Sequence, residues 1–214
     1  MKGKRAYESP LRAGQLEQTR QLILAALTEA IADESVQELT IPLVAERAGV
    51  AVRTVYRHFP TREALFAAWS EWAQENLHVL MQSYPDTLDG LRRVAPELYR
   101  SYDDQAPLIL AMLNSKAARP LREQGRRHRV HSVETALAGL TAEADPVARR
   151  RAVAVLYLLV SAPAWQAMRL QSGLDGAEAG AAAAWAVRVL TDELRRDPDG
   201  PLRQPADDRR GGEP

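Results

Sequence analysis

The stretch of residues 40–65 constrains the fold more than any other part of this 214-residue sequence. Thr40 is a good N-cap, and Pro42 falls in a first helical turn, where a missing N–H costs little. A helix over about 41–48 then has one apolar side, formed by Val44, Ala45 and Ala48. Gly49 follows, and glycine is the residue best able to adopt the left-handed conformation that ends a helix. The pattern predicts a short helix followed by a sharp turn.

A second short helix is predicted after that turn, over about 52–58. Val55 and Phe59 lie at i and i+4, so they share one side of this helix and are expected to point inward. Pro60 ends the helix, because the residue before a proline is pushed out of the α region. Three larger polar side chains remain on the outer side: Arg53, Tyr56 and Arg57. Two short helices joined by a tight turn form a helix-turn-helix.

A longer pattern joins these two helices to the next one: Thr40, Ala45, Ala48-Gly49-Val50, Thr54, Tyr56-Arg57-His58-Phe59 and Thr61-Arg62-Glu63-Ala64-Leu65. On these residues the stretch resembles the DNA-binding domain of the TetR (tetracycline repressor) family of bacterial transcription regulators. The resemblance covers about residues 16–70. Two positions depart from the family pattern. Ala51 stands where a capping Ser or Thr is usual, which loses a hydrogen bond worth about 1 kcal/mol, and Arg62 replaces a common Lys.

The resemblance implies an all-α chain with an N-terminal three-helix helix-turn-helix domain and a C-terminal helical domain for ligand binding and dimerisation. The expected parts are a flexible basic arm (1–13), the DNA-binding domain (14–60), the effector-binding and dimerisation domain (61–196, with a connecting helix over 61–82) and a disordered tail (197–214). The arm is either a solvated tail or a contact to the minor groove and phosphates of DNA.

The remaining helices are predicted from apolar periodicity and from the positions of proline and glycine. Asp145-Pro146 is a strong helix start, and Pro163 is expected to kink the long helix that follows. Tyr84-Pro85-Asp86 is expected to break the helix before it. The predicted helices cover about 16–32, 62–82, 88–102, 107–115, 120–139, 146–171 and 177–196.

The composition agrees with a helical protein and sets limits on its chemistry. The chain is 46% hydrophobic and has no cysteine, which excludes disulfides and thiolate metal sites. It has no apolar run long enough to span a membrane and no apolar stretch near its N-terminus, so we expect a cytoplasmic protein without a membrane partner. Its 28 basic and 28 acidic residues cancel, so attraction to DNA depends on local placement of charge.

The candidate DNA contacts lie on and around the second short helix. Arg53 and Arg57 can pair bidentately with guanine O6 and N7, which is worth about 1–3 kcal/mol of discrimination. Thr54, Tyr56 and Arg62 suit phosphate oxygens, which position the protein without specifying sequence. His58 either closes the turn or touches a phosphate. The expected DNA-binding residues are Thr40, Val52, Arg53, Thr54, Tyr56, Arg57, His58 and Arg62.

Aromatic and methionine side chains later in the chain are the candidates for binding a small-molecule effector, which the resemblance places in the C-terminal domain. Each of them could equally be ordinary packing. Together they suit an apolar ligand, aromatic or polycyclic. The candidates are Trp69, Trp72, Met81, Tyr99, Tyr102, Met112, Trp165 and Met168.

The resemblance also implies that the last two long helices pair with those of a second copy in a four-helix bundle. A monomeric core would explain their apolar character equally well. A homodimer is favoured because one short helix reads too few base pairs, whereas two-fold partners read a palindrome with half-sites about 34 Å apart or a multiple of it. The expected interface residues are Leu156, Leu159, Val160, Trp185 and Val189.

Enzyme and metal chemistry find little support. The sequence has no glycine-rich phosphate loop, no Gly-x-Ser-x-Gly and no His-Glu-x-x-His. His128 and His131 lie at i and i+3 but lack an evident third ligand, so we expect neither metal nor cofactor. The basic stretch 126–131 around them is a solvated helix face or, alternatively, a surface for an anionic ligand or partner.

We therefore expect a ligand-responsive transcriptional regulator, a repressor, that binds a palindromic operator in double-stranded DNA as a homodimer. A small, largely apolar molecule would release it. The alternative is a DNA-binding regulator whose C-terminal domain binds a protein partner or no effector. A closed apolar cavity favours the first hypothesis, and a filled core with an exposed apolar patch favours the second.

Overall fold

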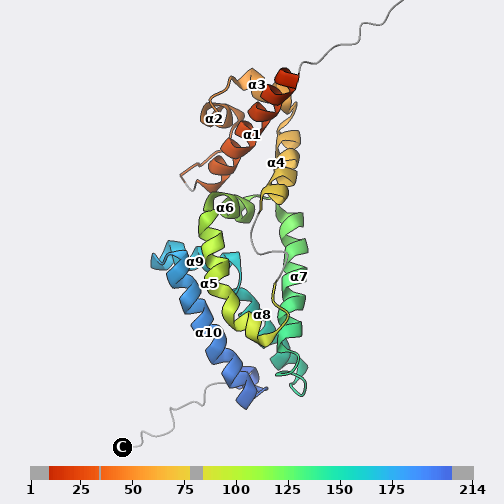
Figure 1. Ribbon diagram of the computed structural model, residues 1–214, viewed down its shortest axis with the longest axis vertical. Coiled ribbons are helices and arrows are strands. Elements are labelled where there is room, and N and C mark those ends of the chain that lie inside the picture. The colour runs from red at the N-terminus through yellow and green to blue at the C-terminus, as the bar shows by residue number, and fades with distance from the viewer. Residues whose placement is uncertain (1–9, 34, 78–83, 204–214) are drawn as a thin grey trace, which may run out of the picture. The chain divides into compact units, whose positions relative to one another are not determined.

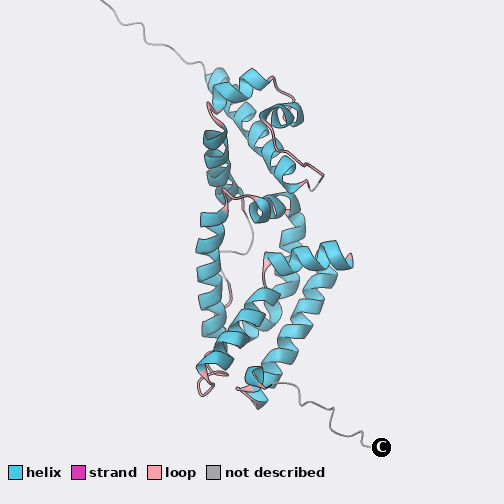
Figure 2. Ribbon diagram, turned by 180° about the vertical axis from the view of Figure 1, so that it is seen from behind, coloured by secondary structure: helices cyan, strands magenta, loops and turns pink. Residues whose placement is uncertain are grey.

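The computed structural model of the chain describes residues 10–33, 35–77 and 84–203. Within these residues the protein is all-α, as predicted, with ten α-helices, one short 3-10 helix and no strand (Figure 2). The chain divides into two compact units. Unit 1 comprises Met1–His78 and Gln105–Glu123, and unit 2 comprises Val79–Asp104 and Gln124–Pro214.

Unit 1 is built around α1, which packs against α2, α4 and α6 (Figure 1). The buried side chains of Ile23, Leu24 and Leu27 on α1 meet apolar side chains of the other helices in one hydrophobic core. Burial of this kind holds helices that are too short to be stable alone. The helices of unit 1 are α1 (Pro10–Ala32), α2 (Ile41–Arg47), α3 (Val52–His58), α4 (Arg62–Asn76) and α6 (Ala106–Asn114).

Unit 2 is dominated by α5 and α10, which lie side by side in both views (Figures 1 and 2). Helices α8 and α9 also pack against α10. The helix α7 (Arg119–Leu137) contributes its first residues to unit 1 and the rest to unit 2. The other elements of unit 2 are α5 (Leu88–Asp104), α8 (Pro146–Leu159), α9 (Ala162–Ser172), α10 (Gly176–Arg196) and the 3-10 helix η1 (Gly200–Leu202).

The backbones of α5 and α10 approach closely at Gly180. A Cβ added to this glycine would lie 2.7 Å from the Cα of Pro96 and 3.0 Å from the carbonyl oxygen of Ala95. Both of these atoms belong to the backbone of α5, so they cannot rotate away as a side chain can. Only glycine therefore allows the two helices to pack at this distance.

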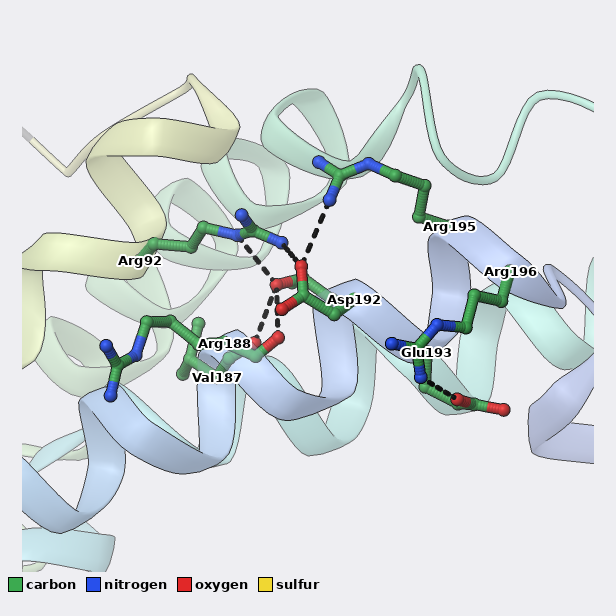
Figure 3. Close-up of polar contacts among 8 residues, drawn as sticks. Arg92, Val187, Arg188, Asp192, Glu193, Arg195 and Arg196 are labelled. Atoms are coloured by element: carbon green, nitrogen blue, oxygen red, sulfur yellow. Dashed lines mark hydrogen bonds and ion pairs between the residues drawn. The ribbon is translucent and has the colours of Figure 1, made fainter.

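Polar contacts tie α5 to the last turns of α10 (Figure 3). The Nε of Arg92 donates to the hydroxyl of Thr191 at 2.9 Å, and its Nη2 donates to the carboxylate of Asp192. Arg195 also pairs with Asp192, at 3.0 Å. The hydrogen bond from Arg92 is the main cause that lowers the pKa of Asp192, so this carboxylate is ionised near neutral pH.

The predicted helix over 146–171 bends next to Pro163, where a kink was expected, but it divides there into two helices, α8 and α9, whose axes differ by 59°. Pro163 has no N–H to donate to the carbonyl of Leu159, its partner in a continuous helix. The hydroxyl of Tyr99 donates to that carbonyl instead, at 2.9 Å. The hydroxyl of Tyr84 donates to the next carbonyl, that of Val160. Two tyrosines thus satisfy the carbonyl groups at the break.

Helix ends differ from the prediction at two further places in unit 1. The helix α1 begins at Pro10, so residues 10–13 of the predicted flexible arm are helical, and residues 1–9 lie outside the described part. Proline is tolerated at a helix start because its missing N–H has no partner there anyway. The helix α4 ends at Asn76, since Leu77 has ψ of 90° and leaves the helix. Residues 78–83, which include Met81, lie outside the described part.

The predicted disordered tail was wrong for residues 198–203, which are ordered around η1. The carboxylate of Asp199 accepts a hydrogen bond from the backbone N–H of Asp145 at 2.8 Å. Arg203 pairs with Asp197 at 2.6 Å, and Arg151 donates to the carbonyl of Pro201 at 3.0 Å. The long-range contacts of Asp199 and Pro201 fasten the segment to the start of α8, which sequence composition could not reveal. Residues 204–214 lie outside the described part.

The close approach at Gly180 leads to a stability prediction. Gly180→Ala should lower the free energy of unfolding by about 1–3 kcal/mol, because its Cβ overpacks against fixed backbone. Gly14, in α1, has no heavy atom within 4 Å of an added Cβ, so Gly14→Ala should instead stabilise by about 0.5–1 kcal/mol. Urea unfolding followed by circular dichroism measures both. Stabilisation by Gly180→Ala would contradict the close packing of α5 and α10.

Candidate nucleic-acid interface

The turn between α2 and α3 sets the direction in which α3 leaves. The hydroxyl of Thr40 accepts a hydrogen bond from the N–H of Leu43 at 3.3 Å and caps α2. Gly49 has a φ of 65°, in the left-handed region that favours glycine. The N–H of Val50 then donates to the carbonyl of Ala45 at 2.9 Å and closes the turn. The helix-turn-helix geometry expected from the sequence is present.

The helix α3 has one buried side and one exposed side. Val55 is 1% exposed and Phe59, just past its end, is 4% exposed, and both belong to the core of unit 1. The opposite side carries two arginines, a tyrosine and a valine, all of them exposed to solvent. These residues, here called the α3 outer face, are Val52, Arg53, Tyr56 and Arg57. Their spacing of i, i+1, i+4 and i+5 places them on neighbouring positions of one helix surface.

The start of α4 places one further arginine, Arg62, near α3 in the sequence, followed by the exposed Glu63. Thr61 caps α4 by accepting a hydrogen bond from the N–H of Ala64 at 3.1 Å. Arg62 is exposed, and its guanidinium carbon lies 5.5 Å from the centre of the Phe66 ring. Thr54 is half-buried on α3. The helix α3 has no acidic residue, so a chain with zero net charge still presents a locally positive surface here.

His58 and Arg20 meet at the end of α3, and Arg20 is a residue that the sequence analysis missed. The guanidinium carbon of Arg20 lies 5.3 Å from the centre of the Phe59 ring. Within the described residues, the buried atoms His58 Nε2 and Arg20 Nη1 have no hydrogen-bond partner. Burial, followed by the charges of Arg57 and Arg20, lowers the pKa of His58. Only the fold brings α1 to this histidine, so motif spacing could not have identified Arg20.

Three of the predicted ligand residues belong to unit 1. Trp69 is fully buried, and its Nε1 donates to the hydroxyl of Thr28 at 2.9 Å. Trp72 is half-buried, and its Nε1 donates to the side chain of Gln21. Met112 is 6% exposed and packs in the same core. Trp69 and Met112 therefore act as packing residues of unit 1.

Four further predicted ligand residues belong to unit 2, and Met81 lies outside the described part. The ring centre of Tyr102 lies 5.9 Å from that of Tyr99 and 5.7 Å from that of Trp165. Each of these three residues is at most 2% exposed, and Met168 on α9 is half-buried. The Nε1 of Trp165 donates to Asp103 at 2.9 Å. Burial raises the pKa of Tyr102 to about 12, so its phenol stays neutral. Tyr99, Tyr102 and Trp165 form a packed aromatic cluster.

The predicted dimer residues fall into two groups. Leu156 is 1% and Val160 0% exposed, so their own chain covers them, and Leu159 is half-buried. Trp185 on α10 is 62% exposed and Val189 is 49% exposed. Exposed Val155 and Leu158 on α8 were not named from the sequence. We call Val155, Leu158, Trp185 and Val189 the apolar face of α8 and α10.

Among the described residues, no group of three or more His, Asp or Glu side chains is placed to hold a metal ion. No described helix is by itself long and apolar enough to cross a membrane, although α8 and α9 together reach that length with their 59° bend.

The helix-turn-helix region is similar to a known protein family. Residues 23–69 match the sequence profile of bacterial regulatory proteins, tetR family. Two nucleoid occlusion factors SlmA, from Vibrio cholerae and Shewanella oneidensis, are each 28% identical to the chain, over 103 and 102 residues. Each match covers 46% of the chain, and 52% and 51% of the two relatives. The chain thus spans about half the length of the curated relatives it matches.

Solved structures match over most of the chain. A tetR-family transcriptional regulator from Streptomyces coelicolor is 18% identical, with 84% of this chain and 87% of that chain covered and a TM-score of 0.52. NalD, the secondary repressor of the MexAB-OprM multidrug efflux pump in Pseudomonas aeruginosa, is also 18% identical, with coverage of 82% and 96% and a TM-score of 0.53. At these identities the likeness concerns the fold.

The missing cap of α3 leads to a prediction. Ala51 has φ of −71° and ψ of 145°, the extended geometry of an N-cap, but its side chain makes no capping hydrogen bond. Ala51→Ser should therefore raise the free energy of unfolding by about 1 kcal/mol. Ala51→Val is the matched control, since it enlarges the side chain without adding an acceptor. Equal effects of the two substitutions in urea unfolding would argue against the capping explanation.

Proposed function

Because residues 23–69 match the tetR family of bacterial regulatory proteins, we propose that the chain is a DNA-binding transcriptional regulator of that family. It acts as a homodimeric repressor on a palindromic operator and is released by a small molecule. The observation that carries this proposal is the α3 outer face. Its side chains are free to enter the major groove because Val55 and Phe59 anchor the other side of the helix in the core.

Each residue of the interface has a chemical role in the proposal. Arg53 and Arg57 read guanine edges, and Val52 contacts a thymine methyl group. Tyr56, Thr54 and Arg62 donate hydrogen bonds to phosphate oxygens. Thr40 does the same at the start of α2, because its oxygen accepts the capping bond while its O–H remains a donor. His58, together with Arg20, contacts one further phosphate.

The proposed dimer uses the apolar face of α8 and α10. Side chains as large as Trp185 and Leu158 are each more than half exposed in the single chain. Large apolar side chains exposed on neighbouring helices are the kind of surface that an interface would cover. A two-fold dimer presents two α3 outer faces, which matches a palindromic site.

A second candidate function follows from the packing of unit 2. Tyr102 contacts both Tyr99 and Trp165, and all three are buried, which favours a structural role over an open aromatic pocket. The apolar face of α8 and α10 is instead exposed. The alternative regulator therefore binds DNA through α3 and a protein partner through this face, without a small effector.

The proposed function is tested by DNA binding. We expect the purified chain to bind DNA from upstream of its own gene more tightly than scrambled DNA, with affinity that falls steeply as salt increases. Fluorescence anisotropy across a salt series measures both properties. Equal, weak binding to the two DNAs would count against regulation at this promoter. If DNA binding requires an added protein, and no small molecule releases the chain from DNA, the second candidate function is favoured.

Two arginine variants separate base reading from phosphate contact. Arg53→Ala should cost about 1–3 kcal/mol on the preferred DNA and little on scrambled DNA, because it removes a bidentate base contact. Arg62→Ala should weaken both DNAs alike and reduce the salt slope by about 1. The same anisotropy assay measures these effects. If Arg53→Ala weakens both DNAs equally, Arg53 is a phosphate contact and not a base reader.

Binding to the preferred DNA should also depend on pH through His58. The pKa of His58 is lowered in the free protein, mainly by burial, and a nearby phosphate would raise it. DNA binding then takes up a proton. Affinity should rise as the pH falls through the raised pKa of the complex and level off below the lowered pKa of the free protein. His58→Gln should flatten this profile. If DNA affinity depends on pH in the same way in the unmodified chain and in His58→Gln, His58 does not contact the DNA.

The dimer proposal predicts a change in oligomeric state. Trp185→Asp should dissociate the dimer, because it replaces the largest exposed apolar side chain with a charge that a partner would bury. Leu170→Asp is the control, since Leu170 on α9 is 52% exposed but lies outside the apolar face. Sedimentation velocity distinguishes the species. A Trp185→Asp protein that remains dimeric would exclude this interface.

A further inference from the structure

A pocket in unit 2 lies between α8, α10 and η1, and none of the aromatic residues predicted to bind a ligand lines it. Its volume is about 640 Å³. Small-molecule sites commonly have volumes of about 300–1,000 Å³, so the pocket is large enough for a ligand of several rings. The segment around η1, which the sequence predicted to be disordered, forms one side of it.

The surface of the pocket is mostly apolar. Three residues that line it belong to the core, with Ala152 at 6%, Leu156 at 1% and Leu194 at 4% exposure. Side chains of Val155, Leu190 and Pro201 line it from α8, α10 and η1. An apolar molecule in this position would remove both its own surface and these side chains from water, which favours binding.

Each charged group that lines the pocket already has a polar partner. Arg203 forms an ion pair with Asp197 at 2.6 Å, and Glu193 lies 3.5 Å from Arg196. Arg151 donates a hydrogen bond to the carbonyl of Pro201 at 3.0 Å. The two arginines and two carboxylates that line the pocket also cancel in charge. A charged ligand would lose hydration here and compete with these pairs, whereas an uncharged ligand would not.

We propose that this pocket binds an uncharged, predominantly apolar small molecule. The molecule contacts α8 and α10 through Val155 and Leu190 and the C-terminal segment through Pro201. This proposal adds a binding site to the proposed function. Only the regulatory role of the bound molecule rests on the proposed function. The binding itself does not depend on that function and is tested without DNA.

The test uses the full chain and the neutral apolar dye Nile red, titrated by fluorescence. The key variants are Val155→Asp and Leu158→Asp, which place the same charge on the same helix at positions that are 49% and 51% exposed. Val155 lines the pocket and Leu158 does not, but both belong to the apolar face. We expect Val155→Asp to weaken dye binding at least about tenfold, because a carboxylate beside an apolar ligand is poorly solvated. Leu158→Asp should not weaken it. Leu170→Asp is the control expected to change it by less than about twofold, because Leu170 on α9 is exposed, does not line the pocket and lies outside the apolar face.

Two further variants keep the test independent of any one substitution. Ala154→Phe adds a phenyl group at an exposed position that lines the pocket, so it should also weaken binding by filling the space. A chain that ends at Arg203 should bind the dye as the full chain does. If removing residues 204–214 is required for binding, the C-terminal residues occupy the pocket and the proposal is overturned.

The outcomes also separate the pocket from the proposed dimer. Equal loss of dye binding in Val155→Asp and Leu158→Asp would mean that the dye binds the apolar face or that a second copy forms the site, and the proposal would fail. Unchanged binding in Val155→Asp and Ala154→Phe would overturn it as well. Selective loss in these two variants supports the pocket, whether or not the chain binds its upstream DNA or dimerises.

Discussion

The burial of one side of α3 is the constraint on which the nucleic-acid interface depends. A helix of seven residues is not stable by itself in water. Val55 and Phe59 hold it against the core of unit 1, and Gly49 sets the direction in which the chain enters it. The same burial decides which residues face outward. Arg53 and Arg57 are exposed because their positions on the helix lie opposite the buried pair, so packing and DNA recognition share one cause.

This interface could be predicted from the sequence because its signals are local. Thr40, Gly49 and Pro60 mark two helix boundaries and a turn within about twenty residues, and each acts through the backbone of its own neighbourhood. The bounds of α3 agree with the predicted range of 52–58. Arg20 could not be predicted from the motif, because its contact with Phe59 joins α1 to the end of α3 and depends on the tertiary fold.

The interior of unit 2 could not be predicted in the same way, because its contacts join distant parts of the chain. The hydroxyl of Tyr99 donates a hydrogen bond to the carbonyl of Leu159, sixty residues later in the sequence. Arg92 donates one to the hydroxyl of Thr191, ninety-nine residues later. An aromatic residue that packs a core and one that lines a cavity have the same sequence signature. The sequence therefore identified Tyr99 as notable but could not tell that its ring and hydroxyl were already engaged in the fold.

The location of a pocket also affects how a ligand could regulate DNA binding. A ligand changes an equilibrium only if it binds the two states with different affinity. A molecule at the aromatic cluster would first have to separate Tyr102 from Trp165, which costs packing in every state of the chain. The pocket between α8, α10 and η1 already has the required volume, and Val155 belongs both to it and to the exposed apolar face. A ligand that contacts Val155 alters the surface available to a second copy, so its affinity must differ between the free chain and any dimer that uses this face. Regulation through this pocket thus needs no opening of the core.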